Sequence, residues 1–203
     1  MFNILKTLKK LPVDFNQYEM REKTKGKLIA LDLVKNGEGK TALDLGCRDG
    51  YWSKKLEELG YKVTAADIKS DYPGWQFVDA DKKLPFADDY FDLIWSSEVL
   101  EHLDNPKFSV SEMKRVLKSG GKIILTTPNS SVWLFRIFNF FGIPAQKLQQ
   151  GGHKHFFSIG DIKTIFPESK IFGFFPYFIL KFRISNLKLI DFLSPVFVIR
   201  EEK

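Results

Sequence analysis

Short apolar runs alternate with amphipathic stretches along the first two thirds of the chain. The apolar runs predict strands at 41–45, 62–66, 76–78, 91–95 and 122–126. Apolar side chains at helical spacing predict helices at 18–34, 52–59 and 109–117, the second ended by Gly60 and the third by a turn at 119–121. Because strands that alternate with helices build βαβ units, we expect an α/β fold with a mostly parallel sheet.

The alternation ends near residue 130. An aromatic helix is predicted at 132–141 and a short helix at 161–166, and strands are predicted to begin at Ile171 and at Val196. Of the 20 phenylalanines, 14 lie after residue 130. This part of the chain is therefore unusually apolar, and it is also basic.

A glycine turn joins the first predicted strand to the helix that follows it. Gly46 and Gly50 let a ligand approach the backbone closely, and the start of the helix offers free amide hydrogens. Asp67 follows Gly46 by 21 residues at the end of the next strand, where a carboxylate can hold both hydroxyls of a ribose. A dinucleotide loop would need glycines where Arg48 and Tyr51 stand, so the pattern disfavours NAD.

Composition adds limits on the compartment and on the kinds of site. With 203 residues, 44% of them hydrophobic and 28% charged, the chain has the composition of one folded domain. Cys47 is the only cysteine, which excludes an intrachain disulfide and a cysteine-based zinc site and fits a reducing compartment. The N-terminal sequence does not have the pattern of a signal peptide, and the longest uncharged apolar run, 171–180, falls short of the roughly 20 residues of a spanning helix. We therefore expect a cytoplasmic protein.

Charge divides the chain into three parts. Residues 1–40 carry 9 basic and 5 acidic side chains, residues 41–129 carry 12 and 15, and residues 130–203 carry 10 and 5. An acidic middle suits a cationic small ligand, and basic ends suit phosphate on lipid, nucleic acid or substrate, although an ordinary solvated surface has the same pattern. Apolar residues also recur every third position among lysines over 2–11, which favours either a peripheral helix at the inner membrane surface or a helix packed on the core.

The chain resembles the class I S-adenosylmethionine (SAM)-dependent methyltransferases, in particular the small type 11 and type 23 group that includes quinone-biosynthesis methyltransferases. Four stretches carry the resemblance in order across 41–129: LDLGCRDG, VTAADI, VDADKKLPFADDYFDLIWSSEVLEHL and VLKSGGKIILTTPN. The resemblance implies a Rossmann-like sheet of seven strands, mostly parallel, in the order 3-2-1-4-5-7-6 with helices on both faces. It also implies SAM as the cofactor and S-adenosylhomocysteine (SAH) as the product.

Cofactor-binding residues follow from the resemblance position by position. Asp44, Gly46, Cys47 and Gly50 would line the methionine moiety, Asp67 the ribose, Ile68 one adenine face, Asp79 and Ala80 the adenine edge, and Ser96 and Ser97 the methionine amine. Arg48 stands where the family usually has a glycine. At Arg48 we expect either an ordinary backbone conformation or a slightly different ligand position.

Two groups of residues are candidates for chemistry at the acceptor. Glu98, Glu101 and His102 would share one face of a helix, where they can hold a divalent metal, provide His102 as a general base, or serve as structural hydrogen bonding. We expect the structural role and assign no metal. His153 and His155 lie on a glycine-led loop, and His155 is preferred as a catalytic residue because the family pattern places a histidine just before the aromatic pair.

The sequence therefore predicts a single methyltransferase domain over 1–203. We expect an N-terminal helical region at 1–40, a cofactor-binding core at 41–129, an acceptor-side insert at 130–157, and a closing helix and β-hairpin at 158–203. The expected reaction is methylation of oxygen on a small or lipid-linked acceptor. An RNA methyltransferase and an inactive SAM-binding module that docks on a membrane or a partner remain alternatives, although nucleic acid is disfavoured because no RNA-binding module is visible.

Overall fold

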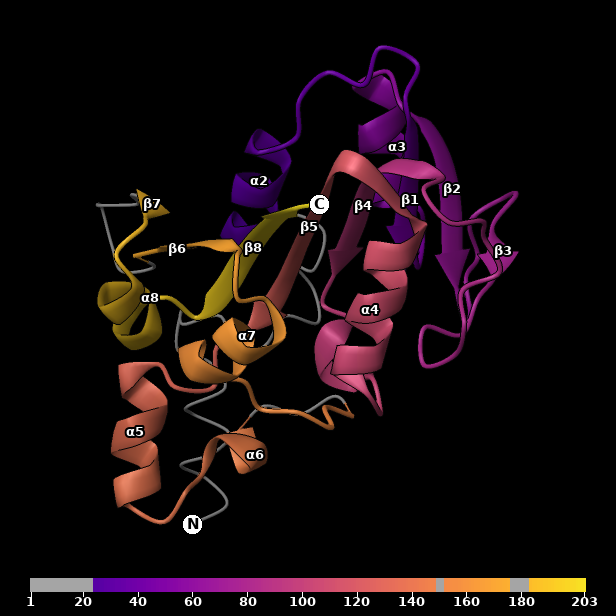
Figure 1. The fold of residues 1–203 in the computed structure, drawn as a ribbon. Coiled ribbons are helices and arrows are strands. Elements are labelled where there is room, and N and C mark those ends of the chain that lie inside the picture. Colours follow the sequence, from indigo (N-terminus) through magenta and orange to yellow (C-terminus); the bar gives the residue numbers. More distant parts are fainter. Residues whose placement is uncertain (1–23, 149–151, 176–182) are drawn as a thin grey trace.

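The described part of the chain folds into an eight-stranded sheet with helices on both faces (Figure 1). The computed structural model describes residues 24–148, 152–175 and 183–203. The strands are β1 (Thr41–Leu45), β2 (Lys62–Asp67), β3 (Gln76–Phe77), β4 (Phe91–Ser97), β5 (Leu117–Pro128), β6 (Lys170–Phe174), β7 (Arg183–Ile184) and β8 (Val196–Glu202). The helices are α2 (Lys25–Asp32), α3 (Tyr51–Glu58), α4 (Pro106–Val116), α5 (Trp133–Phe140), α6 (Ala145–Leu148), α7 (Ile159–Ile165) and α8 (Leu187–Leu193), with a 3₁₀ turn, η1 (Leu100–His102).

The strands lie in the order β3-β2-β1-β4-β5-β8-β6-β7. The first five strands pair in parallel, and β8 lies antiparallel between β5 and β6. The expected order 3-2-1-4-5-7-6 is confirmed, because β8 takes the place of the seventh strand. The expected count of seven is one too low, since the two-residue strand β7 pairs with β6 at the edge.

The sheet is buried on both faces, which explains why its strands read as continuous apolar runs. Alternate residues of one strand enter different cores: Ile94 packs in a core that includes residues of α4 and α7, whereas Leu93 and Trp95 pack in a core with α2 and α3. Figure 1 shows these two pairs of helices on opposite sides of the sheet. The described helices therefore cover both faces, and the strand ends remain as a place where a ligand can enter.

The predicted start of α4 and the predicted turn after it both need correction. The helix begins at Pro106, three residues earlier than predicted, because Asn105 caps it by accepting a hydrogen bond from Phe108 N at 3.1 Å. The predicted turn at 119–121 is part of β5, which begins directly after the helix. A register shift between the pairs Phe91–Leu117 and Leu93–Lys122 marks a bulge here, and Gly120 has a φ of 76°.

The ends of the chain also differ from the sequence-based expectation. The segment predicted as a closing hairpin contains helix α8 between β7 and β8. In α2, which lies within the predicted helix at 18–34, Ile29 and Ala30 are buried and Leu28 is 40% exposed. The predicted helix at 2–11 lies outside the described residues. Among the described helices, none has both the length and the apolar character to cross a bilayer.

Candidate functional site

A cavity of about 530 Å³ lies at the carboxyl ends of β1, β2 and β4. In an open α/β sheet, ligands bind at this end where the strand order reverses, and here the order reverses between β1 and β4. The volume lies within the range of small-molecule sites. Of the candidate site residues, eleven line the cavity: Gly46, Arg48, Asp67, Ile68, Asp79, Ala80, Ser97, Glu98, Glu101, His102 and His153.

The glycine loop between β1 and α3 needs glycine for reasons of packing as well as conformation. Gly46 and Gly50 have φ values of 88° and 75°, in the region where side chains are strained. A Cβ on Gly46 would overlap the side chain of Val99, and a Cβ on Gly50 would overlap the ring of Tyr72. The backbone of Gly46 thus forms part of the cavity wall, whereas Gly50 lies behind it at the start of α3.

Arg48 adopts the left-handed conformation that a glycine would adopt there. Its φ is 50°, which corrects the expectation of an ordinary backbone conformation at this position. The Arg48 amide donates to Asp67 Oδ2 at 2.8 Å, and the Lys69 amide donates to Asp67 Oδ1 at 3.1 Å. These two bonds fix the Asp67 carboxylate at the end of β2, and further lone pairs on its oxygens can accept hydroxyls.

The far side of the cavity is formed by the segment after β3. Asp79 Oδ1 accepts from the Asp81 amide at 3.0 Å, and Asp79 Oδ2 lies 3.3 Å from Lys82 Nζ. Ile68, at the tip of β2, is 64% exposed. This part of the wall therefore offers an exposed aliphatic side chain together with the carboxylates of Asp67 and Asp79.

Five predicted site residues do not line the cavity: Asp44, Cys47, Gly50, Ser96 and His155. Asp44 is buried beneath the glycine loop, where Ser53 Oγ donates to its Oδ2 at 2.6 Å. Burial raises the pKa of Asp44 to about 7. Burial likewise raises the pKa of the Cys47 thiol to about 11, and Cys47 Sγ lies 3.6 Å from Ser70 Oγ. These two buried residues therefore pack under the glycine loop, on the side away from the cavity.

The predicted helical face of Glu98, Glu101 and His102 does not form. Glu98, directly after β4, has a φ of 58°, and the next helical element is the 3₁₀ turn η1, so the three residues do not have α-helical spacing. Glu101 is 1% exposed, and its Oε2 accepts from Thr127 Oγ1 at 3.0 Å. Burial, followed by the nearby charge of Glu98, raises the pKa of Glu101 well above its ordinary value.

The glycine-led loop places His153, and not the preferred His155, at the cavity. The His153 and His102 rings meet edge to face with centroids 4.9 Å apart, and both line the wall. The His155 ring instead stacks on Phe157 with centroids 5.5 Å apart and an interplanar angle of 11°. Sequence reasoning also missed Lys27, a buried lysine of α2 that reaches the cavity.

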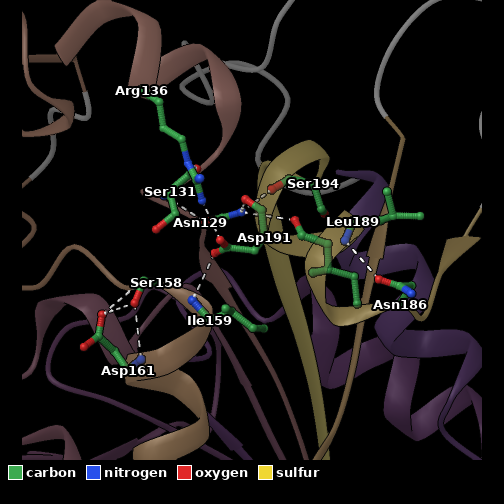
Figure 2. A network of polar contacts seen from close by, with 11 residues as sticks. Asn129, Ser131, Arg136, Ser158, Ile159, Asp161, Asn186, Leu189, Asp191 and Ser194 are labelled. Carbon is green, nitrogen blue, oxygen red and sulfur yellow. Dashed lines mark hydrogen bonds and ion pairs between the residues drawn. The ribbon is translucent and has the colours of Figure 1, made fainter. Parts of the chain in front are cut away.

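The base of the insert is held by a polar network around Asn129, at the end of β5 (Figure 2). Asn129 Nδ2 donates to the carbonyl oxygens of Asp191 at 2.9 Å and Ser194 at 2.8 Å, near the end of α8. Arg136 of α5 pairs with the Asp191 carboxylate at 2.5 Å. The same carboxylate accepts from the Ile159 amide at 3.3 Å, so one residue of α8 connects α5 and α7.

Comparison with known families gives one match that spans most of the chain. A family of proteins described as "Methyltransferase domain" matches residues 16–169. The match covers the glycine loop, the acidic strand ends, η1 and the insert.

Curated relatives are similar over about half of this chain. A malonyl-[acyl-carrier protein] O-methyltransferase of Buchnera aphidicola is 29% identical over 58% of this chain and 51% of its own length. A ubiquinone biosynthesis O-methyltransferase of Idiomarina loihiensis is 31% identical over 49% of this chain and 47% of its own length. The chain thus spans about half the length of the curated relatives it matches.

Solved structures share the fold over nearly the whole chain. A SAM-dependent methyltransferase from Thermotoga maritima superposes with a TM-score of 0.66 at 17% identity, covering 100% of both chains. One from Archaeoglobus fulgidus has a TM-score of 0.60 at 21% identity, covering 92% of this chain and 98% of the other. Both of these solved proteins are named as SAM-dependent methyltransferases, and at these identities the likeness shows a shared fold.

Proposed function

Because the chain belongs to the family of methyltransferase domains, we propose that it binds SAM in the cavity at the ends of β1, β2 and β4 and methylates an oxygen of a small or lipid-linked acceptor. One observation carries the proposal: the backbone of Gly46 and the carboxylates of Asp67 and Asp79 meet at the wall of a single cavity, although they come from three different strand ends. These are the groups that the methionine, ribose and adenine parts of SAM need.

The residues of the wall fit the cofactor part by part. Asp67 would accept the ribose hydroxyls, Ile68 would lie against one adenine face, and Asp79 with Ala80 would meet the adenine edge. Ser97, whose Oγ is 2.9 Å from Thr126 Oγ1, would lie at the methionine end. Gly46 keeps the backbone open for close approach. Asp44, Cys47, Gly50 and Ser96 would support this surface from behind.

The bound cofactor would supply a methyl group activated by its sulfonium leaving group. The protein mainly has to align the acceptor and exclude water, since the displacement is in line at carbon. A hydroxyl acceptor must also lose its proton. His102 Nδ1 lies 3.2 Å from Gly152 O, and when Nδ1 donates there, Nε2 keeps a lone pair for the acceptor's proton or for a cation.

The surface beside the insert supports an amphiphilic or lipid-linked acceptor. Phe140 and Phe141, at the end of α5, are 85% and 71% exposed, and Phe192 of α8 is 47% exposed. The Arg136 guanidinium lies 5.9 Å from the centre of the Phe192 ring, so a cationic group lies beside these apolar ones. Relatives named for malonyl-acyl carrier protein, ubiquinone and demethylmenaquinone are consistent with such acceptors.

Calorimetry with SAH tests the cofactor site. We expect the unchanged chain to bind with micromolar-range affinity, and Asp67→Ala to bind about 10- to 150-fold more weakly, as expected when a hydrogen bond to a charged group is removed. Asp71→Ala is the matched control, because Asp71 is an exposed aspartate four residues further on that does not line the cavity. The proposal fails if the unchanged chain does not bind, or if both variants bind equally well.

A further inference from the structure

Three side chains that can ligate a metal converge on one wall of the cavity. Glu101, His102 and His153 each offer a ligand atom, and these atoms all lie within 4.8 Å of one another. Two of the residues are neighbours in η1, whereas the third comes from the insert, about 50 positions later in the chain. The fold therefore adds a second imidazole, from the insert, to a carboxylate and an imidazole that are adjacent in the sequence.

The carboxylate has an oxygen without a hydrogen-bond partner. Glu101 Oε1 is buried, and within the described residues it has no hydrogen-bond partner, whereas Oε2 is bound by Thr127. A buried polar atom of this kind costs free energy unless something satisfies it. The nearest ligand atom is His102 Nε2 at 4.0 Å, too far for a hydrogen bond and wide enough for an ion between the two atoms.

The two histidines are held in place by backbone contacts. His102 Nδ1 lies 3.2 Å from Gly152 O, so the ring can donate there and turn the Nε2 lone pair toward Glu101. Metal-bound histidines almost always make this second hydrogen bond to a carbonyl or carboxylate. The amides of Lys154 and His155 both donate to Glu101 O, at 2.8 and 3.0 Å, and hold the loop that carries His153 against η1.

We propose that Glu101, His102 and His153 bind a divalent first-row transition cation of the Zn²⁺ or Fe²⁺ kind. Two imidazoles and one carboxylate are a ligand set typical of these ions and leave positions open for water or substrate. Ligand atoms bound at about 2.0–2.2 Å lie no more than about 4.2 Å apart. The ligand atoms here lie within 4.8 Å of one another, so a bound ion would draw the most widely separated of them closer together.

The ion would face the space that an acceptor occupies, an inference that rests on the proposed function. A hydroxyl or phenol oxygen bound to it would release its proton to solvent more readily. That oxygen's electron pair then forms the C–O bond, while the C–S bond breaks and its pair stays on sulfur. The acceptor class is accordingly an alcohol or phenol whose oxygen can reach a metal, and His102 is then a ligand and not the proton acceptor.

Titration of the chelator-treated full chain with Zn²⁺, and with Co²⁺ as a spectroscopic probe, tests the site. We expect one ion per chain, with a visible Co²⁺ absorption that Zn²⁺ abolishes. His153→Ala should weaken binding at least tenfold and remove the absorption. His155→Ala is the matched control, because the chain has three histidines and the His155 ring stacks on Phe157 outside the cluster. This control should bind like the unchanged chain.

Further measurements make each outcome decisive. Two further single variants, Glu101→Gln and His102→Ala, remove the other two ligands. Because Glu101 is buried, its replacement can affect folding, so the melting temperature of each variant is measured without metal to show whether it folds. The proposal is overturned if the unchanged chain binds no ion, or if His155→Ala loses as much affinity as His153→Ala. SAH binding is measured on the same samples. Metal binding without SAH binding would remove the proposed function and leave the site, and the reverse result would remove the site alone.

Discussion

Gly46 and Arg48 both have positive φ values, but substitutions at these two positions should change the stability of the fold in opposite directions. Replacing Arg48 by glycine relieves about 1–2 kcal/mol of backbone strain in the folded state. The same change makes the unfolded chain more flexible, which stabilises the unfolded state by about 0.4–1 kcal/mol. The hydrogen bond from the amide of residue 48 to the Asp67 carboxylate is kept, because its donor is the backbone N–H. Urea unfolding should therefore show unchanged stability or a gain of up to about 1.6 kcal/mol.

Gly46→Ala provides the contrast in the same loop. The added Cβ overlaps Val99 and sits at a φ of 88°, so we expect a loss of about 2–4 kcal/mol in the same experiment. If Arg48→Gly were instead the more destabilising change, the arginine side chain would make a contribution that the backbone conformation does not explain.

Asp44 should make stability depend on pH. Its pKa of about 7 in the fold exceeds its ordinary value of 3.8, so between about pH 4 and pH 7 the unfolded chain loses this proton while the folded chain keeps it. Stability therefore falls as pH rises through this window and stays lower above pH 7. Asp44→Asn should remove the fall, with a gain over the unchanged chain that grows from near zero at pH 4 to as much as about 4 kcal/mol above pH 7.

Glu112→Gln is a control with the opposite sign. The hydrogen bond from Arg115 lowers the pKa of Glu112, so this carboxylate adds stability above its ordinary pKa of 4.5, and that stability is lost as pH falls through the lower folded pKa. Equal pH profiles for the unchanged chain and Asp44→Asn would contradict the prediction for Asp44.

Local spacing predicted Asp67 at the end of β2, and the family resemblance predicted Asp79, which follows β3 by two residues; both line the cavity. It was not enough for the histidines. Whether His153 or His155 points inward depends on how the loop after Gly152 is held by Glu101 O, a contact between segments about 50 residues apart. For the same reason the 3₁₀ turn at Glu101 could not be distinguished from a helix by sequence spacing.

Asn129 connects the end of β5 to the helices that carry the insert. Asn129→Ala would leave the carbonyl oxygens of Asp191 and Ser194 without their buried donor (Figure 2), so we expect a loss of about 2–3 kcal/mol in chemical unfolding. Asn139→Ala, at an exposed position of α5, should change stability by no more than about 0.5 kcal/mol. Equal losses for the two variants would show that the network carries no stability.

Elements were predictable where apolar periodicity was strong and local. Strand β1 and helix α3 lie where the sequence predicts them, because each has a clear apolar pattern and a glycine at its boundary. The early start of α4 depends on the cap at Asn105, and the long β5 depends on pairing with β4 across a bulge. Helix α8 escaped prediction because the apolar content of its segment also fits a hairpin.

The uneven distribution of aromatic and basic residues leads to a prediction for vesicle binding. We expect the full chain to co-sediment with anionic vesicles at low salt and to dissociate as salt rises, because each basic residue near the surface contributes about 1 kcal/mol. Phe140→Ser with Phe141→Ser should weaken binding. Phe77→Ser is the control, because Phe77 is 69% exposed on β3, at the other edge of the sheet.

A second arm uses a chain without residues 1–12, which lie outside the described residues and carry the lysine-flanked apolar pattern. Its retention on anionic vesicles would assign the contact to α5 and α8, and its loss would assign it to the N-terminal segment. If the full chain binds neither anionic nor neutral vesicles at low salt, the acceptor is a water-soluble molecule.

Cys47, the one cysteine of the chain, lies in the glycine loop between β1 and α3. With a pKa of about 11, only about one Cys47 thiol in 10,000 is ionised at neutral pH, and the side chain is 4% exposed. Alkylating reagents therefore react at an appreciable rate only with molecules in which the loop has opened. The unmodified protein thus carries its own chemical reporter of loop opening, and the labelling rate with and without a bound ligand measures how firmly that ligand closes the loop.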